Sequence, residues 1–432
     1  MKLWQKDNTE FSSFIHRFTV GRDNEFDLRL ARYDVLGSIA HIAMLCSTGL
    51  LPQEEYELLN TELEDILATI DNGEFELMPG IEDIHSQIEL MLTERVGEAG
   101  KKIHSGRSRN DQVAVDIKLF LRAEILHIQQ LTLELFHILQ QLSENNKEHL
   151  LPGYTHLQLA MPSSFGLWFG AWAESLVDDM RLLATAYDMA NRNPLGSGAG
   201  YGSSFPLNRT QTTQLLQFGN LHYNSIYAQM SRGKTERFAA MALSSIAATL
   251  GRMSMDICLY MNQNFAFLSL PPALTTGSSI MPHKKNPDVF ELIRGKCSRI
   301  QSVPNELALL LGNLPSGYHR DVQYTKEILF PAIEDLKDCL QVTILVLPSV
   351  QVRADILKDD KYTYLFTVEK INELVNSGIP FRDAYRQVGN SVEGGTFTHN
   401  GNIQHTHEGS IGKLCNEEIK EMMKEVCRRF RP

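Results

Sequence analysis

Several common signatures are missing from this sequence of 432 residues. Its six cysteines form no Cys-x-x-Cys pair, which argues against a disulfide framework and against a cysteine-based zinc site. No uninterrupted apolar run is long enough to span a membrane, and the first residues lack the apolar core of a secretory signal. We therefore expect reduced thiols, no insertion into a membrane and a cytoplasmic location.

Positive charge is also scarce. The chain has 41 Lys and Arg residues against 52 Asp and Glu residues, which gives a formal net charge of −11. This balance disfavours a nucleic-acid-binding surface. An acidic protein that holds an anionic ligand has to gather its positive groups locally. The candidates for such a local gathering are Arg107, Arg109, Lys284 and Lys285.

Two ligand-binding patterns are incomplete. The glycine-rich run 196–202 lacks a preceding strand and the dinucleotide spacing, so we reject a nucleotide-binding loop. His399, His405 and His407 could suggest a metal ion, but no carboxylate or cysteine stands at ligand spacing beside them. We expect neither a bound cofactor nor a metal ion.

Helical periodicity is abundant. From Gln112 to Asn145, apolar residues recur at the spacing of one helix face. Four more long helical segments are expected, at 162–191, 235–262, 286–312 with a kink at Pro304, and 322–347 with Pro331 inside it. Five long helices predict a mainly α fold with a central helix bundle.

The segment 235–262 is rich in small and apolar residues on every side, so we expect it to be buried all round, between packed subunits. Shorter patterns before and after the long segments predict a three-domain subunit. Its parts would be a mainly helical N-terminal domain at 1–110, the long-helix bundle at 111–352 and a small helical C-terminal domain at 353–432.

The stretch 275–288 carries the most distinctive chemistry. A Gly277-Ser278-Ser279 turn that can move is followed by two lysines and a helix start, with Asn286 as N-cap and Pro287 as first helical residue. An anion before that helix would meet free amides, the helix dipole and Lys284. The hydroxyl of Ser278 could then remove a proton from carbon next to a carboxylate. The alternative is a serine-rich turn before a solvated basic helix start.

Four other polar motifs are present, and three of them have a structural alternative. Ser108, Arg109 and Asn110 form either a carboxylate clamp or a basic loop capped by Asp111. Thr155 and His156 lie in a turn, where the imidazole is either solvated or placed for proton transfer. The polar run 318–327, which contains Tyr318, Gln323 and Lys326, is either a ligand-binding segment or a solvated helix start. The fourth motif, 82–86, contains Asp83.

These motifs support a resemblance. Residues 277–287 resemble the signature loop of the fumarase/aspartase superfamily, and 104–112 and 153–158 resemble motifs of the argininosuccinate lyase family within it. Further matches cover most of the chain and are weakest after about residue 395. The resemblance implies a homotetramer whose active sites each combine parts of three subunits. It also implies cleavage of argininosuccinate to arginine and fumarate without cofactor or metal.

The resemblance assigns a role to each candidate residue. It implies that Ser278 takes the proton, that Lys284 and Asn286 hold the resulting dianion, and that His156 protonates the departing nitrogen. It implies substrate contacts from Asp83, a candidate for the ammonium group, and from Ser108, Arg109, Asn110, Thr155, Tyr318, Gln323 and Lys326.

Several positions depart from the family pattern. His283 stands where relatives usually carry Gln, and Leu159 where they usually carry Arg. The run 231–234 reverses the usual charge, and Asp23 falls near an expected substrate-binding serine. These departures leave a modified argininosuccinate open as the substrate. Adenylosuccinate lyase is the alternative enzyme, and a crystallin-like structural protein is the alternative outside enzymes.

Overall fold

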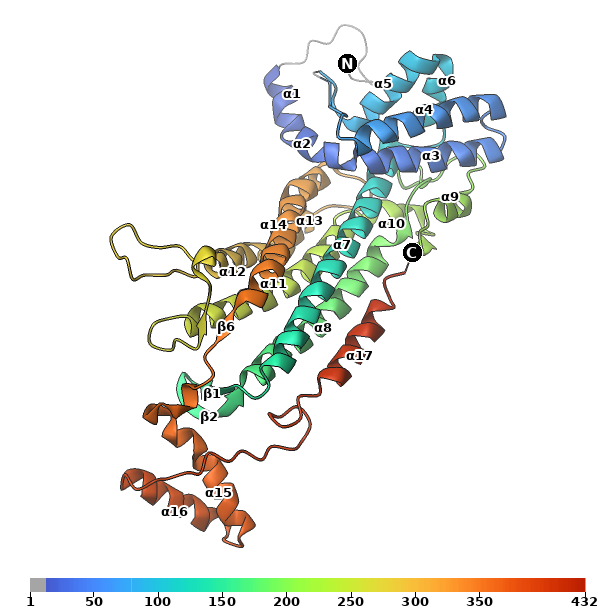
Figure 1. Cartoon of the computed structure of the whole chain (residues 1–432). Coiled ribbons are helices and arrows are strands. Elements are labelled where there is room, and N and C mark those ends of the chain that lie inside the picture. The colour runs from blue at the N-terminus through green and yellow to red at the C-terminus, as the bar shows by residue number, and fades with distance from the viewer. Residues whose placement is uncertain (1–12, 79, 432) are drawn as a thin grey trace.

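A computed structural model describes residues 13–78 and 80–431. The fold is mainly helical, with long helices running side by side along its length (Figure 1). Helices α1 to α6 gather at one end, and the β1–β2 hairpin with α15 and α16 lies at the other. The N-terminal helices are α1 (Ser13–Val20), α2 (Asp23–Asp27), α3 (Ala31–Ser47), α4 (Gln53–Asp71), α5 (Ile84–Val96) and α6 (Glu98–Lys101).

The long helices appear where the periodicity predicts them. They are α7 (Arg109–Asn145), α8 (Phe165–Ala190), α11 (Lys234–Tyr260), the pair α12 (Asp288–Ile300) and α13 (Val303–Leu311), and α14 (Tyr324–Val346). The expected helix at 286–312 is therefore two helices, because the chain breaks before Pro304, which stands in the first turn of α13. Pro331 lies inside α14 as predicted.

One hydrophobic core runs through the long helices and into the N-terminal end. Phe120 of α7 and Phe330 of α14 pack with ring centroids 4.2 Å apart, and Phe26 of α2 meets Phe330 edge-on. The N-terminal helices are thus fixed to the ends of α7 and α14 by aromatic packing. This junction determines which side chains meet at that end of the bundle.

Helix α11 is less enclosed than its sequence predicts. Among the described residues it is the one helix that is long and apolar enough to cross a membrane. Half of its most apolar 18-residue segment is buried inside the chain. It packs against α8, α12 and α14, while Ala248, Arg252 and Met255 on its other side are exposed. The expectation of burial on every side is therefore not met within one chain.

The C-terminal segment returns to the bundle. Helices α15 (Thr367–Asn376) and α16 (Phe381–Glu393) lie at the hairpin end, whereas α17 (Asn416–Cys427) packs along α8 (Figure 1). The Tyr187 hydroxyl donates to the carbonyl of Arg431 at 3.0 Å. The short elements are α9 (Arg209–Leu215), α10 (Ser225–Met230), β1 (Leu150–Thr155), β2 (Gln158–Ser164), β3 (Arg192–Asn193), β4 (Asn220–Leu221), β5 (Leu268–Ser269) and β6 (Gln351–Val352).

Candidate active site

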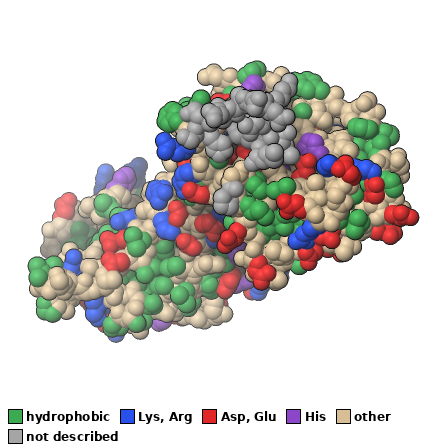
Figure 2. All heavy atoms as spheres, turned by 90° about the horizontal axis from the view of Figure 1, so that it is seen from above, with side chains coloured by type: hydrophobic (Ala, Val, Ile, Leu, Met, Phe, Trp, Pro, Cys, Tyr) green, Lys and Arg blue, Asp and Glu red, His purple; other side chains and the backbone are tan. Residues whose placement is uncertain are grey.

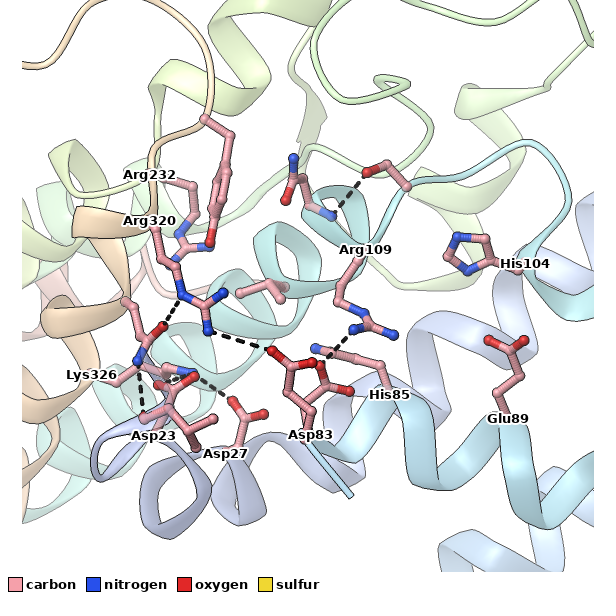
Figure 3. A pocket seen from close by; sticks show the side chains of 17 residues that line it. Asp23, Asp27, Asp83, His85, Glu89, His104, Arg109, Arg232, Arg320 and Lys326 are labelled. Atoms are coloured by element: carbon pink, nitrogen blue, oxygen red, sulfur yellow. Dashed lines mark hydrogen bonds and ion pairs between the residues drawn. The ribbon is translucent and has the colours of Figure 1, made fainter. Parts of the chain in front are cut away.

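A cavity of about 660 Å³ lies at the N-terminal end of α7. Residues of α2, α5, α7 and the segment before α14 line it (Figure 3). It brings together seven of the residues predicted from the sequence, namely Asp83, Ser108, Arg109, Asn110, Tyr318, Gln323 and Lys326. It also contains residues that the sequence analysis did not select, namely Asp27, Glu82, His85, Glu89, His104, Arg232 and Arg320.

A capping box places Arg109 and Asn110 at this cavity. Ser108 caps α7 by accepting from the Asn110 amide at 3.2 Å, and Asp111 accepts in return from the Ser108 amide at 3.0 Å. Asp111 is completely buried and also accepts from the Ser197 hydroxyl and from loop amides. The glycine-rich run 196–202 therefore supports the start of α7 by wrapping the Asp111 carboxylate.

Arg109 is held by Asp83. Its Nη1 lies 2.8 Å from Asp83 Oδ2, and its Nη2 donates to the Ser86 hydroxyl at 3.0 Å. Asp83 is at the same time the N-cap of α5, since its Oδ1 accepts from the Ser86 amide at 2.8 Å. Burial raises the pKa of Asp83, but the charges of His85 and Arg109 outweigh burial and leave this pKa below its usual range. Asp83 thus stays ionised and fixes the guanidinium at the wall of the cavity.

A buried charge cluster lies beneath this pair. His85 Nδ1 is 3.0 Å from Asp34 Oδ1 and 3.8 Å from Asp116 Oδ2, and all three side chains are buried. Burial lowers the pKa of His85, but the carboxylates, Asp34 foremost, outweigh it and raise the pKa to about 9. Burial raises the pKa of Asp116 well above its usual range. These three residues offer ligand atoms close enough for a metal ion, yet the His85 charge already balances part of the cluster.

Arg107 belongs to that cluster rather than to the cavity wall. It is buried, its Nη1 donates to the Ser38 hydroxyl at 3.1 Å, and it interacts electrostatically with Asp34 and Asp116. The expectation that Arg107 serves an anionic ligand is therefore wrong for this chain. Asp34 lies in α3, far from this motif in sequence, whereas Asp116 lies in α7 only nine residues after Arg107. Only the presence of acids at core positions could have indicated the cluster.

Thr155 and His156 lie elsewhere. They occupy the exposed tip of the β1–β2 hairpin, where Thr155 pairs with Gln158. Figure 1 shows this hairpin at the opposite end of α7 from α5. Because α7 has 37 residues, that end is about 55 Å away along the helix axis. The hairpin tip and the cavity of one chain therefore do not meet.

The stretch 275–287 forms a loop that projects from the bundle before α12 (Figure 1). Thr276 and Asn286 close it through an isolated antiparallel bridge, in which the Asn286 amide donates to the Thr276 carbonyl at 2.9 Å. Ser278 Oγ accepts from the Met281 amide at 3.2 Å, and Lys284 is exposed. The loop carries Ser278, Lys284 and Asn286 together, but it lies away from both the cavity at the start of α7 and the tip of the β1–β2 hairpin.

One sequence prediction about this loop is wrong. Helix α12 begins at Asp288 with Pro287 in the N-cap position, and Asn286 does not cap the helix. The physical reason is the bridge to Thr276, which takes the Asn286 backbone groups, while its side chain donates to the Thr276 hydroxyl at 3.4 Å. Asn286 therefore closes the loop, and its amide group stays on the loop beside the lysines.

Charged side chains of both signs are intermixed over the described part of the face seen from above (Figure 2). The cavity shows the same mixture: it is lined by Asp23, Asp27, Glu82, Asp83 and Glu89 and by Arg109, Arg232, Arg320 and Lys326. A ligand with both positive and negative groups fits such a lining better than a simple anion does.

Comparisons with known proteins identify the family and agree with the fold. A family model described as Lyase matches residues 14–302. The argininosuccinate lyase of Bacteroides thetaiotaomicron is 59% identical over 425 residues, covering 98% of this chain and 95% of the relative. That of Thermotoga neapolitana is 40% identical over 387 residues, covering 90% and 97%. Among solved structures, EDDS lyase in complex with formate has a TM-score of 0.75 at 20% identity, covering 98% and 91%, which shows the shared fold.

Proposed function

The chain belongs to the argininosuccinate lyase family, and from this membership we propose that it cleaves argininosuccinate reversibly to L-arginine and fumarate in arginine biosynthesis. The observation that carries the proposal is the cavity at the start of α7, where seven residues predicted from three separate motifs line one space of mixed charge. Argininosuccinate has three carboxylates, a guanidinium and an ammonium, so its charge pattern suits that lining.

The proposed chemistry is a β-elimination that uses only side chains and backbone amides of the protein. Ser278 removes the proton next to the succinyl carboxylate, and Lys284 with Asn286 and loop amides stabilises the dianion that forms. His156 protonates the departing guanidino nitrogen. Each proton transfer contributes on the order of a hundredfold to ten-thousandfold, so electrostatic stabilisation of the dianion supplies most of the acceleration. The Met281 amide donates to Ser278 Oγ at 3.2 Å, a contact that favours the ionised form of this hydroxyl, which is the form that acts as a base.

We further propose a homotetramer whose subunits share active sites. Support comes from the separation of the cavity, the hairpin tip and the 275–287 loop within one chain. Large apolar side chains on α12, α13 and α14 are also exposed: Leu292 is 69%, Leu309 75% and Leu345 72% accessible. Exposed apolar side chains of this size, and the open side of α11, are typical of helices that pack between subunits.

Two further properties belong to the same proposal. The chain divides into domains at 1–110, 111–352 and 353–432, although α17 packs on α8 of the middle part. The protein works in the cytoplasm, where its six free cysteines stay reduced.

Fumarate release, followed by ultraviolet absorbance, tests the activity. Argininosuccinate and adenylosuccinate are offered separately to the purified protein and to Ser278→Ala. We expect release from argininosuccinate alone, and its loss in the variant. If the wild-type protein released no fumarate from argininosuccinate, the proposed reaction would be contradicted.

Mixing two inactive variants tests the shared site. Arg109→Ala and Ser278→Ala subunits are unfolded together, refolded and assayed. If the two residues of one active site come from different subunits, some sites in the hybrid contain neither substitution and activity returns. A mixture as inactive as its components, with hybrid tetramers shown by mass, would place both residues of a site in one chain.

A further inference from the structure

Asp23 and Asp27 hold the same lysine at one end of the cavity (Figure 3). Lys326 Nζ lies 2.7 Å from Asp23 Oδ1 and 2.5 Å from Asp27 Oδ1. The side chains of Asp27 and Lys326 are only 3% and 4% exposed, whereas that of Asp23 is 21% exposed. Lys326 thus has one counter-ion enclosed in the protein and a second that reaches the cavity.

The second carboxylate leaves this corner with excess negative charge. Asp27 alone would neutralise Lys326, and Asp23 adds a further charge that Lys326 does not balance. Arg232 lines the same cavity and its charge also acts on Asp23, but its Nε is paired with the buried Glu236, 3.1 Å from Oε1. Burial also raises the pKa of Asp23, so its charge is costly to maintain there. A costly carboxylate that the fold does not need for neutrality points to a ligand.

We propose that Asp23 binds the α-ammonium group of the arginine portion of the substrate and selects a free α-amino group over an acylated one. This inference rests on the proposed function. An ammonium brings the missing positive charge and N–H donors for the accessible Asp23 oxygen. An α-amide is uncharged and larger, and it would cover the Asp23 carboxylate without balancing its charge.

Two departures from the family pattern support this assignment. Asp23 stands near the position of an expected serine, and Arg232 belongs to the run with reversed charge. Both line this end of the cavity, away from Ser278, Lys284 and His156. The differences from the family pattern therefore fall on the recognition of the substrate's amino-acid end and leave the elimination residues unchanged. Asp83, which already caps α5 and holds Arg109, is less free to take the ammonium.

The wild-type protein provides the first test. L-arginine and Nα-acetyl-L-arginine are compared as inhibitors of fumarate release, because both carry the same guanidinium and carboxylate. We expect arginine to inhibit on the order of tenfold or more strongly, as befits one charge-assisted hydrogen bond. Equal inhibition by the two compounds would overturn the inference while leaving the proposed reaction intact, since the assay itself requires that reaction.

Variants provide the second test. Asp23→Asn keeps the size of the side chain and removes its charge, and Asp23→Ser supplies the expected serine if the first variant folds poorly. We expect KM for argininosuccinate to rise on the order of tenfold to a hundredfold, with a smaller change in kcat, and the preference for arginine over acetylarginine to shrink equally. The matched control Asp27→Asn should lower the melting temperature but keep that preference. A loss of stability in Asp23→Asn with an unchanged preference would make Asp23 a structural counter-ion only.

Discussion

His156 and Leu157 both hold left-handed backbone conformations, with φ angles of 54° and 58°, at the two-residue tip of the β1–β2 hairpin. Such a turn normally takes Asn and Gly, because both positions need positive φ. Here a histidine and a leucine occupy it, and Leu157 is 80% exposed. The tip therefore combines backbone strain with an apolar side chain that has no cover in the single chain, a combination typical of functional turns.

Replacing Leu157 by glycine should relieve this strain. A non-glycine residue in the left-handed region costs about 1–2 kcal/mol, and glycine regains part of this despite its own entropy cost. Leu157→Gly should therefore be more stable than the matched control Leu159→Gly, by about 1 kcal/mol. Leu159 is exposed on β2, where the backbone is extended. Chemical denaturation of both variants measures the difference, and a less stable Leu157→Gly would show that the turn is not strained.

The ion pair of Asp83 and Arg109 leads to a second prediction. Asp83→Ala removes the N-cap of α5 and the partner of Arg109 in one step. We expect a loss of about 1–2 kcal/mol in the free energy of unfolding from the cap alone. The fall in kcat/KM should exceed that of Ser86→Ala, because Arg109 then loses the carboxylate that orients it. Thermal melting and fumarate release check the two effects, and unchanged kinetics in Asp83→Ala would deny the orienting role.

His85 gives the protein a dependence on pH. Its folded pKa of about 9 lies above the ordinary value of 6.5. Because a raised pKa means that the folded state binds the proton more tightly, this stabilisation is complete below pH 6.5 and is lost as pH rises through 9. The difference corresponds to about 3 kcal/mol. The melting temperature should therefore fall between pH 7 and pH 9.5 in the wild-type protein.

The variant His85→Gln isolates this effect. It keeps a hydrogen-bond donor near Asp34 but has no proton to lose, so its melting temperature should be lower at pH 7 and change less with pH. Other groups titrate in both proteins and cancel in the comparison. Lys118 is one of them, since burial lowers its pKa to about 7. Parallel pH profiles for the two proteins would mean that His85 loses no stabilising proton between pH 7 and pH 9.5.

Helix positions were predictable because periodicity is a local property of the sequence. The predicted start at Gln112 differs from the observed start at Arg109 by less than one turn. The apolar periodicity does not include the first turn, which is fixed by the capping box of Ser108 and Asp111. The wrong N-cap at Asn286 has a similar origin. Its sequence neighbours favour a cap, but a backbone bridge to Thr276, ten residues earlier, takes precedence.

Contacts between distant residues could not be predicted in this way. Lys326 and Asp27 are 299 residues apart, and the sequence gives no sign that they form a buried pair. The same holds for His85 with Asp34 and Asp116, which meet only when α3, α5 and α7 pack together. The motifs indicate which residues are candidates for binding or catalysis. The packing of the helices determines which of these charged side chains already have a partner within the protein.

Lys284 and His156 allow the proposed division of chemistry to be tested by turnover. If stabilisation of the dianion supplies more of the acceleration than proton donation does, Lys284→Met should lower kcat at least as much as His156→Asn. We expect a fall on the order of a hundredfold to ten-thousandfold for His156→Asn, and a fall of about a thousandfold or more for Lys284→Met. Both side chains are exposed in the single chain, so neither change should impair its folding.

Lys285→Met is the matched control, because Lys285 is an equally exposed lysine on the same loop. Its kcat should fall much less, since the Lys284 charge remains in place. Fumarate release at saturating argininosuccinate measures all three variants. Near-normal turnover in Lys284→Met would refute the assignment of the dianion to this lysine. Equal losses in the two lysine variants would show that the loop acts through its total charge, and the anion would then have to be held by the loop amides and by Asn286.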